Sequence, residues 1–118
     1  MKNEDTGLKR LLSAFGYSLK GLTHAFKTET AFRQETLLAL ILVPVAIFVG
    51  NTGLERALLV ASVLLVLIVE LLNTAVEAVV DRIGHEFHEL AGYAKDVGSA
   101  AVLLTLIQVV VVWLLIIF

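Results

Sequence analysis

The sequence predicts an all-α membrane protein with a single domain over residues 1–118, in which an N-terminal amphipathic surface helix precedes three transmembrane helices. Hydrophobic residues make up 58% of the chain, whereas soluble domains contain about 45–50%. The apolar runs are long enough to cross a bilayer, and a chain of 118 residues leaves no room for a second domain of ordinary size. The sequence contains no cysteine, which excludes disulfides and thiolate metal sites.

The surface helix is expected over about residues 6–28. Apolar side chains recur there at helical spacing, at Leu8, Leu11, Leu12, Phe15, Leu19, Leu22 and Phe26. Lys9, Lys20 and Lys27 fall largely off that stripe. A basic amphipathic helix of this kind lies in the membrane interface with its apolar face down. The alternative, a helix packed on a soluble core, lacks such a core elsewhere in the sequence.

The first transmembrane span is expected over about residues 30–50. Its clean apolar part, Leu37–Gly50, has only 14 residues, fewer than the roughly 20 that a bilayer needs. The polar residues at 33–35 should therefore lie near the lipid headgroups. Pro44 should kink the helix because its nitrogen cannot donate a hydrogen bond, and the GNTG sequence at 50–53 should form a tight turn.

The second span, over about residues 54–83, has no helix breaker before Gly84. About 30 residues form about 45 Å of helix, whereas the hydrocarbon core is about 30 Å thick, so this helix should overshoot the membrane. Glu70 would then lie inside the membrane, and Glu77 and Asp81 at or beyond its boundary. A polar connector, His85–Asp96, should lead to the third span at about 97–118, whose small residues at 98–101 allow close helix packing.

The distribution of lysine and arginine predicts the orientation in the membrane. Six of the nine precede the apolar part of the first span, Arg56 lies in the first connection, and Arg82 and Lys95 flank the second connection. The positive-inside rule places the N-terminus and the second connection in the cytoplasm and the C-terminus outside.

Four polar side chains form one stripe on the second span: Glu70, Asn73, Glu77 and Asp81 lie within roughly 80° of each other around a helix. A charge at the centre of a membrane helix costs about 2.5–3.5 kcal/mol and usually marks a functional site. For Asn73 a structural role is equally open, because its side chain could form a hydrogen bond to a neighbouring helix. The carboxylates fit either a proton relay or a metal and acid–base site. A relay needs titratable groups through the full membrane depth, and Ala57–Val69 contains only Ser62 as a polar residue.

An acidic cluster at one membrane face suits an enzyme that joins a water-soluble reagent to a lipid. Mg²⁺ is usually held by one or two carboxylates together with substrate phosphates, which makes Glu77 a candidate ligand, with Glu29 facing it. Glu70 lies deeper and suits a general base that acts on a lipid hydroxyl. Lys95, beside Asp96, and His88 could contact phosphate. A zinc site at His85 and His88 is the alternative, but HEFHE lacks the HExxH spacing.

Several segments resemble the small integral-membrane diacylglycerol kinases of bacteria: GYSLKGL, AFRQE, VELLN with AVEAVVDRIG, and EFHELAGYAKDVGSAAV. The resemblance covers nearly the whole chain. It implies a homotrimer in the bacterial cytoplasmic (inner) membrane, with active sites at the subunit interfaces, surrounded by membrane lipids. The implied reaction transfers the γ-phosphate of ATP directly to diacylglycerol and yields phosphatidic acid. The partners are then ATP, diacylglycerol and Mg²⁺, with no nucleic acid.

The resemblance also implies roles for individual residues. Glu70 would be the catalytic base, Glu29 and Glu77 would bind the metal, and Asn73 and Asp81 would support the site. The ATP site would contain Arg10, Tyr17, Glu29, Glu77, Glu86, Phe87, His88, Lys95 and Asp96. The lipid site would contain Ala14, Phe15, Gly16, Tyr17, Ser18, Leu19, Ala31, Phe32, Arg33, Gln34, Glu35, Arg56, Glu70, Ser99 and Trp113.

Two alternatives to diacylglycerol phosphorylation stay open from the sequence. A sister branch of the same family phosphorylates undecaprenol with the same chemistry, although the EFHELAGYAKD connector is more similar to the diacylglycerol branch. A non-enzymatic membrane subunit, whose carboxylates stabilise a partner, is the other alternative. Leu19, Phe26 and Tyr93 depart from the family pattern, in which we expect two tryptophans and a basic residue.

Overall fold

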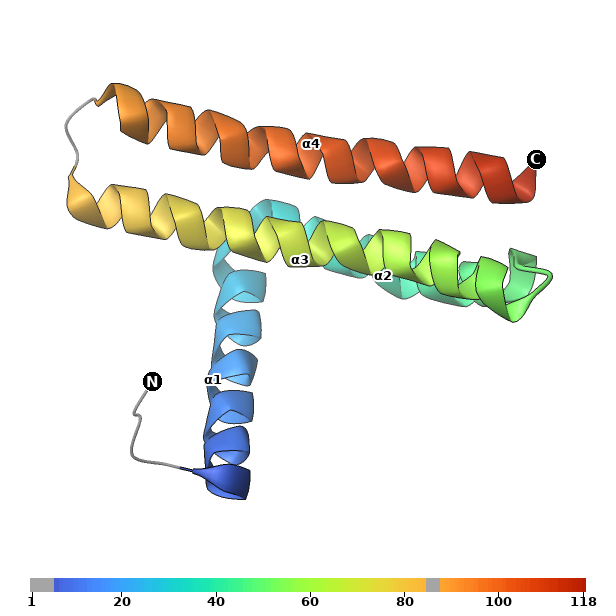
Figure 1. Cartoon of the computed structure of the whole chain (residues 1–118), viewed down its shortest axis with the longest axis horizontal. Coiled ribbons are helices and arrows are strands. Elements are labelled where there is room, and N and C mark those ends of the chain that lie inside the picture. The colour runs from blue at the N-terminus through green and yellow to red at the C-terminus, as the bar shows by residue number, and fades with distance from the viewer. Residues whose placement is uncertain (1–5, 85–87) are drawn as a thin grey trace.

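The computed structural model describes residues 6–84 and 88–118, and these residues form four helices. The helices are α1 (Gly7–Thr28), α2 (Thr30–Val49), α3 (Gly53–Ile83) and α4 (Glu89–Ile117). Figure 1 shows α3 and α4 running side by side, with α1 crossing their long direction. Within the described ranges, α3 is the central helix and packs on both α2 and α4. The all-α fold class predicted from the sequence is confirmed.

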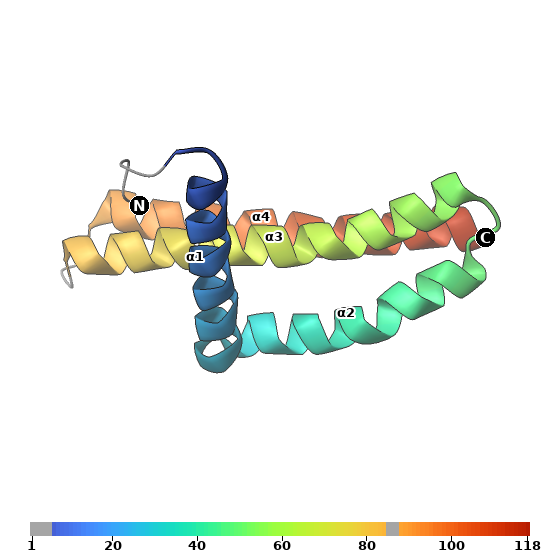
Figure 2. The ribbon, with the colours of Figure 1, turned by 90° about the horizontal axis from the view of Figure 1, so that it is seen from below.

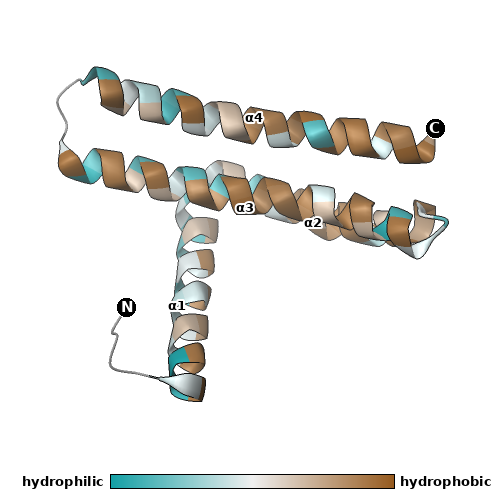
Figure 3. Ribbon diagram, viewed as in Figure 1, coloured by the Kyte–Doolittle hydropathy of each residue, from teal (hydrophilic) through white to brown (hydrophobic). Residues whose placement is uncertain are grey.

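The helices α2, α3 and α4 are each long and apolar enough to cross a membrane. Figure 3 shows mostly hydrophobic residues on α3 and α4, with hydrophilic ones among them, whereas α1 is mixed. Large apolar side chains cover the outside of the bundle, and Phe48, for example, is 89% exposed. Such a surface is unfavourable in water and favourable against lipid or another subunit. The interfacial position of α1 and the trimer stay predictions.

The corner between α1 and α2 consists of a single residue, Glu29, in an extended conformation. Its backbone N–H donates to the carbonyl of Ala25 at 2.8 Å, and its own carbonyl accepts from the Arg33 N–H at 3.0 Å. Arg33 Nη1 also donates to the carbonyls of Phe26 at 2.9 Å and Lys27 at 3.1 Å. A guanidinium at the C-terminal end of a helix satisfies its free carbonyls and interacts favourably with its dipole. Arg33 therefore fixes the corner.

A second arginine has the same role at the turn between α2 and α3. Arg56 Nε donates to the carbonyl of Ile47 at 3.0 Å. Thr52 Oγ1 caps α3 by accepting from the Glu55 N–H at 3.1 Å, and Glu55 Oε1 accepts from the Asn51 N–H at 2.9 Å. Gly50 is buried here, and a Cβ at this position would lie 2.5 Å from Arg56 Cγ. The turn is as tight as its sequence predicts.

Two further expectations concern helix shape. Pro44 lies inside α2. Here Figure 2 shows that α2 bends toward α3 in its C-terminal half, as a missing hydrogen-bond donor predicts.

The expectation of a connector over the whole of His85–Asp96 is wrong, because α4 begins at Glu89. His88 caps this helix, its Nδ1 accepting from the Leu90 N–H at 3.1 Å. Polar residues form helix readily once a cap is present, so the helix begins before the apolar run.

Candidate active site

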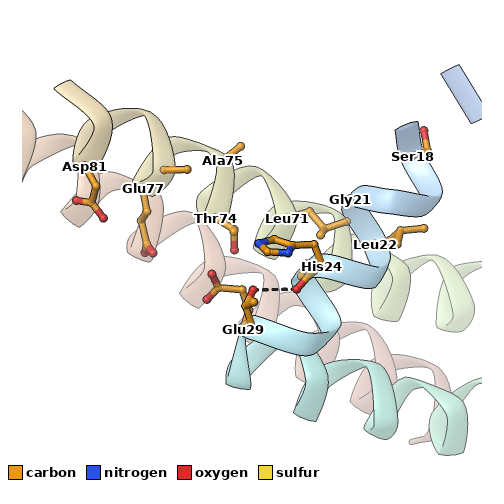
Figure 4. A pocket seen from close by; sticks show the side chains of 13 residues that line it. Ser18, Gly21, Leu22, His24, Glu29, Leu71, Thr74, Ala75, Glu77 and Asp81 are labelled. Carbon is orange, nitrogen blue, oxygen red and sulfur yellow. Dashed lines mark hydrogen bonds between the residues drawn. The ribbon is translucent and has the colours of Figure 1, made fainter. Parts of the chain in front are cut away.

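A hollow of about 690 Å³ lies between the last turns of α1, the corner at Glu29 and the C-terminal half of α3. Figure 4 shows Glu29 and Glu77 directed into it from these two elements, with His24 and Thr74 nearby. The hollow is lined by Ser18, Gly21, Leu22, His24, Ala25, Thr28, Glu29, Leu71, Thr74, Ala75, Glu77, Ala78 and Asp81. The structure thus brings three of the sequence-predicted acidic residues to one cavity.

The two predicted metal ligands reach the hollow for different reasons. Glu29 is there because it is the corner residue, and Glu77 because it lies on the polar stripe of α3; both are partly buried. In residues 6–84 and 88–118, no group of three or more histidine, aspartate or glutamate side chains could hold a metal. Two carboxylates facing an open cavity nevertheless fit Mg²⁺, which takes one or two carboxylates and completes its shell with phosphate and water.

Asn73 and Asp81 connect the hollow to the neighbouring residues. Asn73 Nδ2 donates to Glu77 Oε1 at 3.2 Å, one turn along α3. Asp81 Oδ1 pairs with Lys95 Nζ of α4 at 2.7 Å, and both side chains are exposed. An exposed ion pair contributes little stability because water screens both charges, so Lys95 can exchange Asp81 for a phosphate at small cost.

Glu70 does not line this hollow. It lies about two turns before Glu77 on α3, is only 8% exposed, and has its carboxyl group beside that of Glu35 from α2. Oε2 of Glu35 is buried and receives no hydrogen bond from the described residues. Two carboxylates in contact repel each other, so a hydrogen bond between them requires one shared proton.

The comparison with known proteins gives the family. Residues 16–117 match the family model of prokaryotic diacylglycerol kinase. The chain belongs to this family. It is 53% identical over 113 residues to the diacylglycerol kinase of Escherichia coli (strain K12), covering 96% of this chain and 93% of that relative. It is 57% identical over 108 residues to the Haemophilus influenzae diacylglycerol kinase, covering 92% of each chain.

A more distant relative, the diacylglycerol kinase of Helicobacter pylori (strain ATCC 700392 / 26695), is 44% identical over 91% of this chain and 84% of its own length. Membership of the prokaryotic diacylglycerol kinase family makes the chain a kinase, which decides against a non-enzymatic subunit. Together with the three apolar helices, it makes the chain a bacterial membrane protein.

The predicted ATP-site residues of this family member are only partly brought together. Tyr17, on α1, lies under Lys20, whose Nζ is 5.9 Å from the ring centroid. The N-terminal turns of α1, which carry Arg10, project away from α4, which carries Lys95 and Asp96 (Figure 1). His88 is exposed and caps α4. The predictions for Glu86 and Phe87 lie outside the described residues.

The predicted lipid-site residues are spread over both ends of the molecule. One group lies on α1 and the start of α2: Ala14, Phe15, Gly16, Tyr17, Ser18, Leu19, Ala31, Phe32, Arg33, Gln34 and Glu35. Phe32 is 3% exposed and packs inside the chain. Arg56 lies beyond, at the turn between α2 and α3, about 30 Å of helix from Glu77. Ser99 is exposed on α4.

Trp113 belongs to a polar cluster that we did not predict. Its Nε1 donates to Ser62 Oγ at 3.2 Å, and Gln108 Nε2 donates to the carbonyls of Ser62 at 2.8 Å and Thr105 at 2.9 Å. Isolated polar residues in apolar helices are the signal for such contacts between membrane helices. The cluster joins α3 to α4 at the end away from the acidic residues.

Proposed function

We propose that the protein transfers the γ-phosphate of ATP to diacylglycerol at the cytoplasmic face of the membrane, producing phosphatidic acid. The observation that carries this proposal is the convergence of Glu29 and Glu77 on one hollow, at the end of α3 where the polar stripe leaves the apolar segment. The relatives named diacylglycerol kinase support diacylglycerol rather than undecaprenol as the lipid.

Glu29 and Glu77 would hold Mg²⁺ through their carboxylates, in a site that they share with the ATP phosphates. Bound Mg²⁺ supplies positive charge that offsets the negative charge of the transferring phosphoryl group. Lys95 adds a second positive charge at the edge of the hollow once it leaves Asp81. Phosphoryl transfer needs such positioning and charge neutralisation more than covalent help from the protein.

Glu70 would act as the general base. In the transfer, the proton of the lipid hydroxyl moves to the Glu70 carboxylate, and the hydroxyl oxygen forms a bond to the γ-phosphorus. The bond between this phosphorus and the bridging oxygen of ADP breaks, so ADP leaves without a phosphoenzyme. The neighbouring Glu35 carboxyl would be the hydrogen-bonding partner that holds Glu70 in place for this step.

A homotrimer with sites between subunits fits the open geometry of one chain. Figure 1 shows that the start of α1, which carries Arg10, lies far from α4, which carries Lys95. The hollow is partly open to its surroundings. A neighbouring subunit would close this hollow and cover the exposed apolar faces. The N-terminus would lie in the cytoplasm, with the C-terminus outside, and α1 would lie in the interface.

The test is phosphate transfer from labelled Mg-ATP in lipid bilayers, with diacylglycerol and undecaprenol offered separately. Wild type should label phosphatidic acid, and Glu70→Gln should lower the rate by about 10²–10⁴-fold, the usual contribution of a general base. Chemical cross-linking confirms that both proteins form the same oligomer. Product from undecaprenol alone would move the protein to the other branch. No product from either lipid, with the oligomer intact, would overturn the proposal.

A further inference from the structure

The contact between Asn73 and Gly98 carries an inference about how Glu77 is held. Asn73 uses its amide nitrogen to donate to Glu77 Oε1 at 3.2 Å. Its other amide atom, Oδ1, is buried and receives no hydrogen bond from the described part of the chain. The reversed amide would place a carbonyl oxygen against the Glu77 carboxylate, and these two acceptors repel each other. Glu77 therefore selects the orientation of the amide, and the unpaired oxygen faces α4.

Gly98 of α4 provides the space for this amide. A Cβ at residue 98 would lie 2.1 Å from Asn73 Oδ1 and 3.2 Å from Asn73 Cγ, but 3.9 Å from Asn73 Cβ. Only the end of the Asn73 side chain would have to move. The amide is a rigid planar group, so a displacement of Oδ1 also displaces Nδ2 and breaks its contact with Glu77.

We propose that Gly98 is a positioning residue, which acts through Asn73 to hold the Glu77 carboxylate in the orientation that binds Mg²⁺. The proposal rests on the metal-binding role of Glu77 in the proposed function. A glycine inside a helix is destabilising relative to alanine, and at residue 98 the missing Cβ is what leaves room for the Asn73 amide. Gly92 provides the comparison within α4, because a Cβ there meets nothing within 4 Å.

The first measurement is binding of Mn²⁺, a spectroscopic substitute for Mg²⁺, by electron paramagnetic resonance with a non-hydrolysable ATP analogue. Gly98→Ala and Asn73→Ala should each weaken Mn²⁺ binding about fivefold or more. Gly92→Ala should bind Mn²⁺ like wild type. In transfer assays, Gly98→Ala should raise the Mg²⁺ concentration for half-maximal rate by a similar factor, with a smaller change in kcat. Equal Mn²⁺ affinity in Gly98→Ala and wild type would overturn the proposal.

A double variant separates positioning from general damage. In Asn73→Ala the displaced group is absent, so adding Gly98→Ala should cause no further loss of Mn²⁺ affinity, whereas independent effects would multiply. A further loss in the double variant would overturn the proposal. If Gly98→Ala alone does not assemble, the comparison of Asn73→Ala with the double variant still tests the proposal by the same criterion. Wild type without transfer activity would instead contradict the proposed function, which makes the two failures distinguishable.

Discussion

Glu35 and Glu70 place two carboxyl groups from different helices side by side in a nearly buried position. The sequence indicated Glu70 as a base and Glu35 as a lipid contact near the headgroups. Their proximity depends on the rotation of α2 about its axis, which hydropathy does not determine in an all-apolar helix. The same limit applies to Arg33 and Arg56, because a guanidinium suits a helix carbonyl as well as a lipid phosphate.

The carboxyl pair predicts different effects for two similar substitutions. Glu35→Gln provides an amide N–H that can replace the shared proton as donor to Glu70, so transfer should stay within about tenfold of wild type. Glu70→Gln removes the base and should lose about 10²–10⁴-fold. Initial rates with saturating diacylglycerol and Mg-ATP measure both variants in parallel. Equal losses in the two variants would show that Glu35 itself takes part in proton removal.

At the scale of elements, single arginines close both described helix connections. Arg33 donates to the last carbonyls of α1, and Arg56 to a carbonyl near the end of α2. A short polar connection would otherwise leave those carbonyls exposed to lipid headgroups or hydrocarbon. The capped N-terminus of α4 explains why a helix extends through residues that the sequence presents as a polar connector. Hydropathy locates the apolar part of a helix, whereas caps decide where the helix begins.

Removal of the Arg33 cap should loosen the corner. In Arg33→Gln, the shorter side chain should not reach the carbonyls of Phe26 and Lys27, so the angle between α1 and α2 should vary more. Because the chain has no native cysteine, nitroxide labels at Leu12→Cys and Leu40→Cys report this directly. Their distance distribution, measured with labelled chains diluted in unlabelled ones, should become broader. Gln34→Ala, at an exposed neighbouring position, is the control that should keep a narrow distribution.

A loss of about 1.5–3 kcal/mol in the free energy of unfolding should accompany Arg33→Gln, since hydrogen bonds that involve charged groups fall in this range. Thermal unfolding of the same two variants in micelles checks this value. An unchanged distance distribution together with unchanged stability would contradict the cap's structural role.

At the scale of the whole molecule, the sequence predicted the helical class and the three long apolar helices well. Backbone groups in hydrocarbon must be satisfied within a helix, so long apolar runs leave little choice of structure. The hypothesis that Glu29 faces Glu77 also came from the sequence. Glu29 stands at the start of α2 and Glu77 near the end of α3, and these ends of two successive helices lie at the same side of the bundle. The polar cluster of Ser62, Gln108 and Trp113 was not, because it depends on the register between α3 and α4.

The length of α3 predicts a dependence on bilayer thickness. Its 31 residues form about 46 Å of helix, against a hydrocarbon core of about 30 Å. In bilayers with progressively longer acyl chains, the hollow should be drawn toward the hydrocarbon and the transfer rate should fall severalfold. The KM for Mg-ATP should rise more than that for diacylglycerol. Rates that do not vary across a series of vesicles with increasing chain length would contradict this prediction.

The single-residue corner at Glu29 also bears on how this chain can change during evolution. Most connections between helices absorb inserted or deleted residues, since a loop can lengthen without moving the elements that it joins. Here one inserted residue would change the direction and rotation of α2 relative to α1, and would move Arg33 away from the carbonyls of Phe26 and Lys27. Substitutions are compatible with this corner on both sides of residue 29, but the length of the connection between α1 and α2 has to stay at one residue.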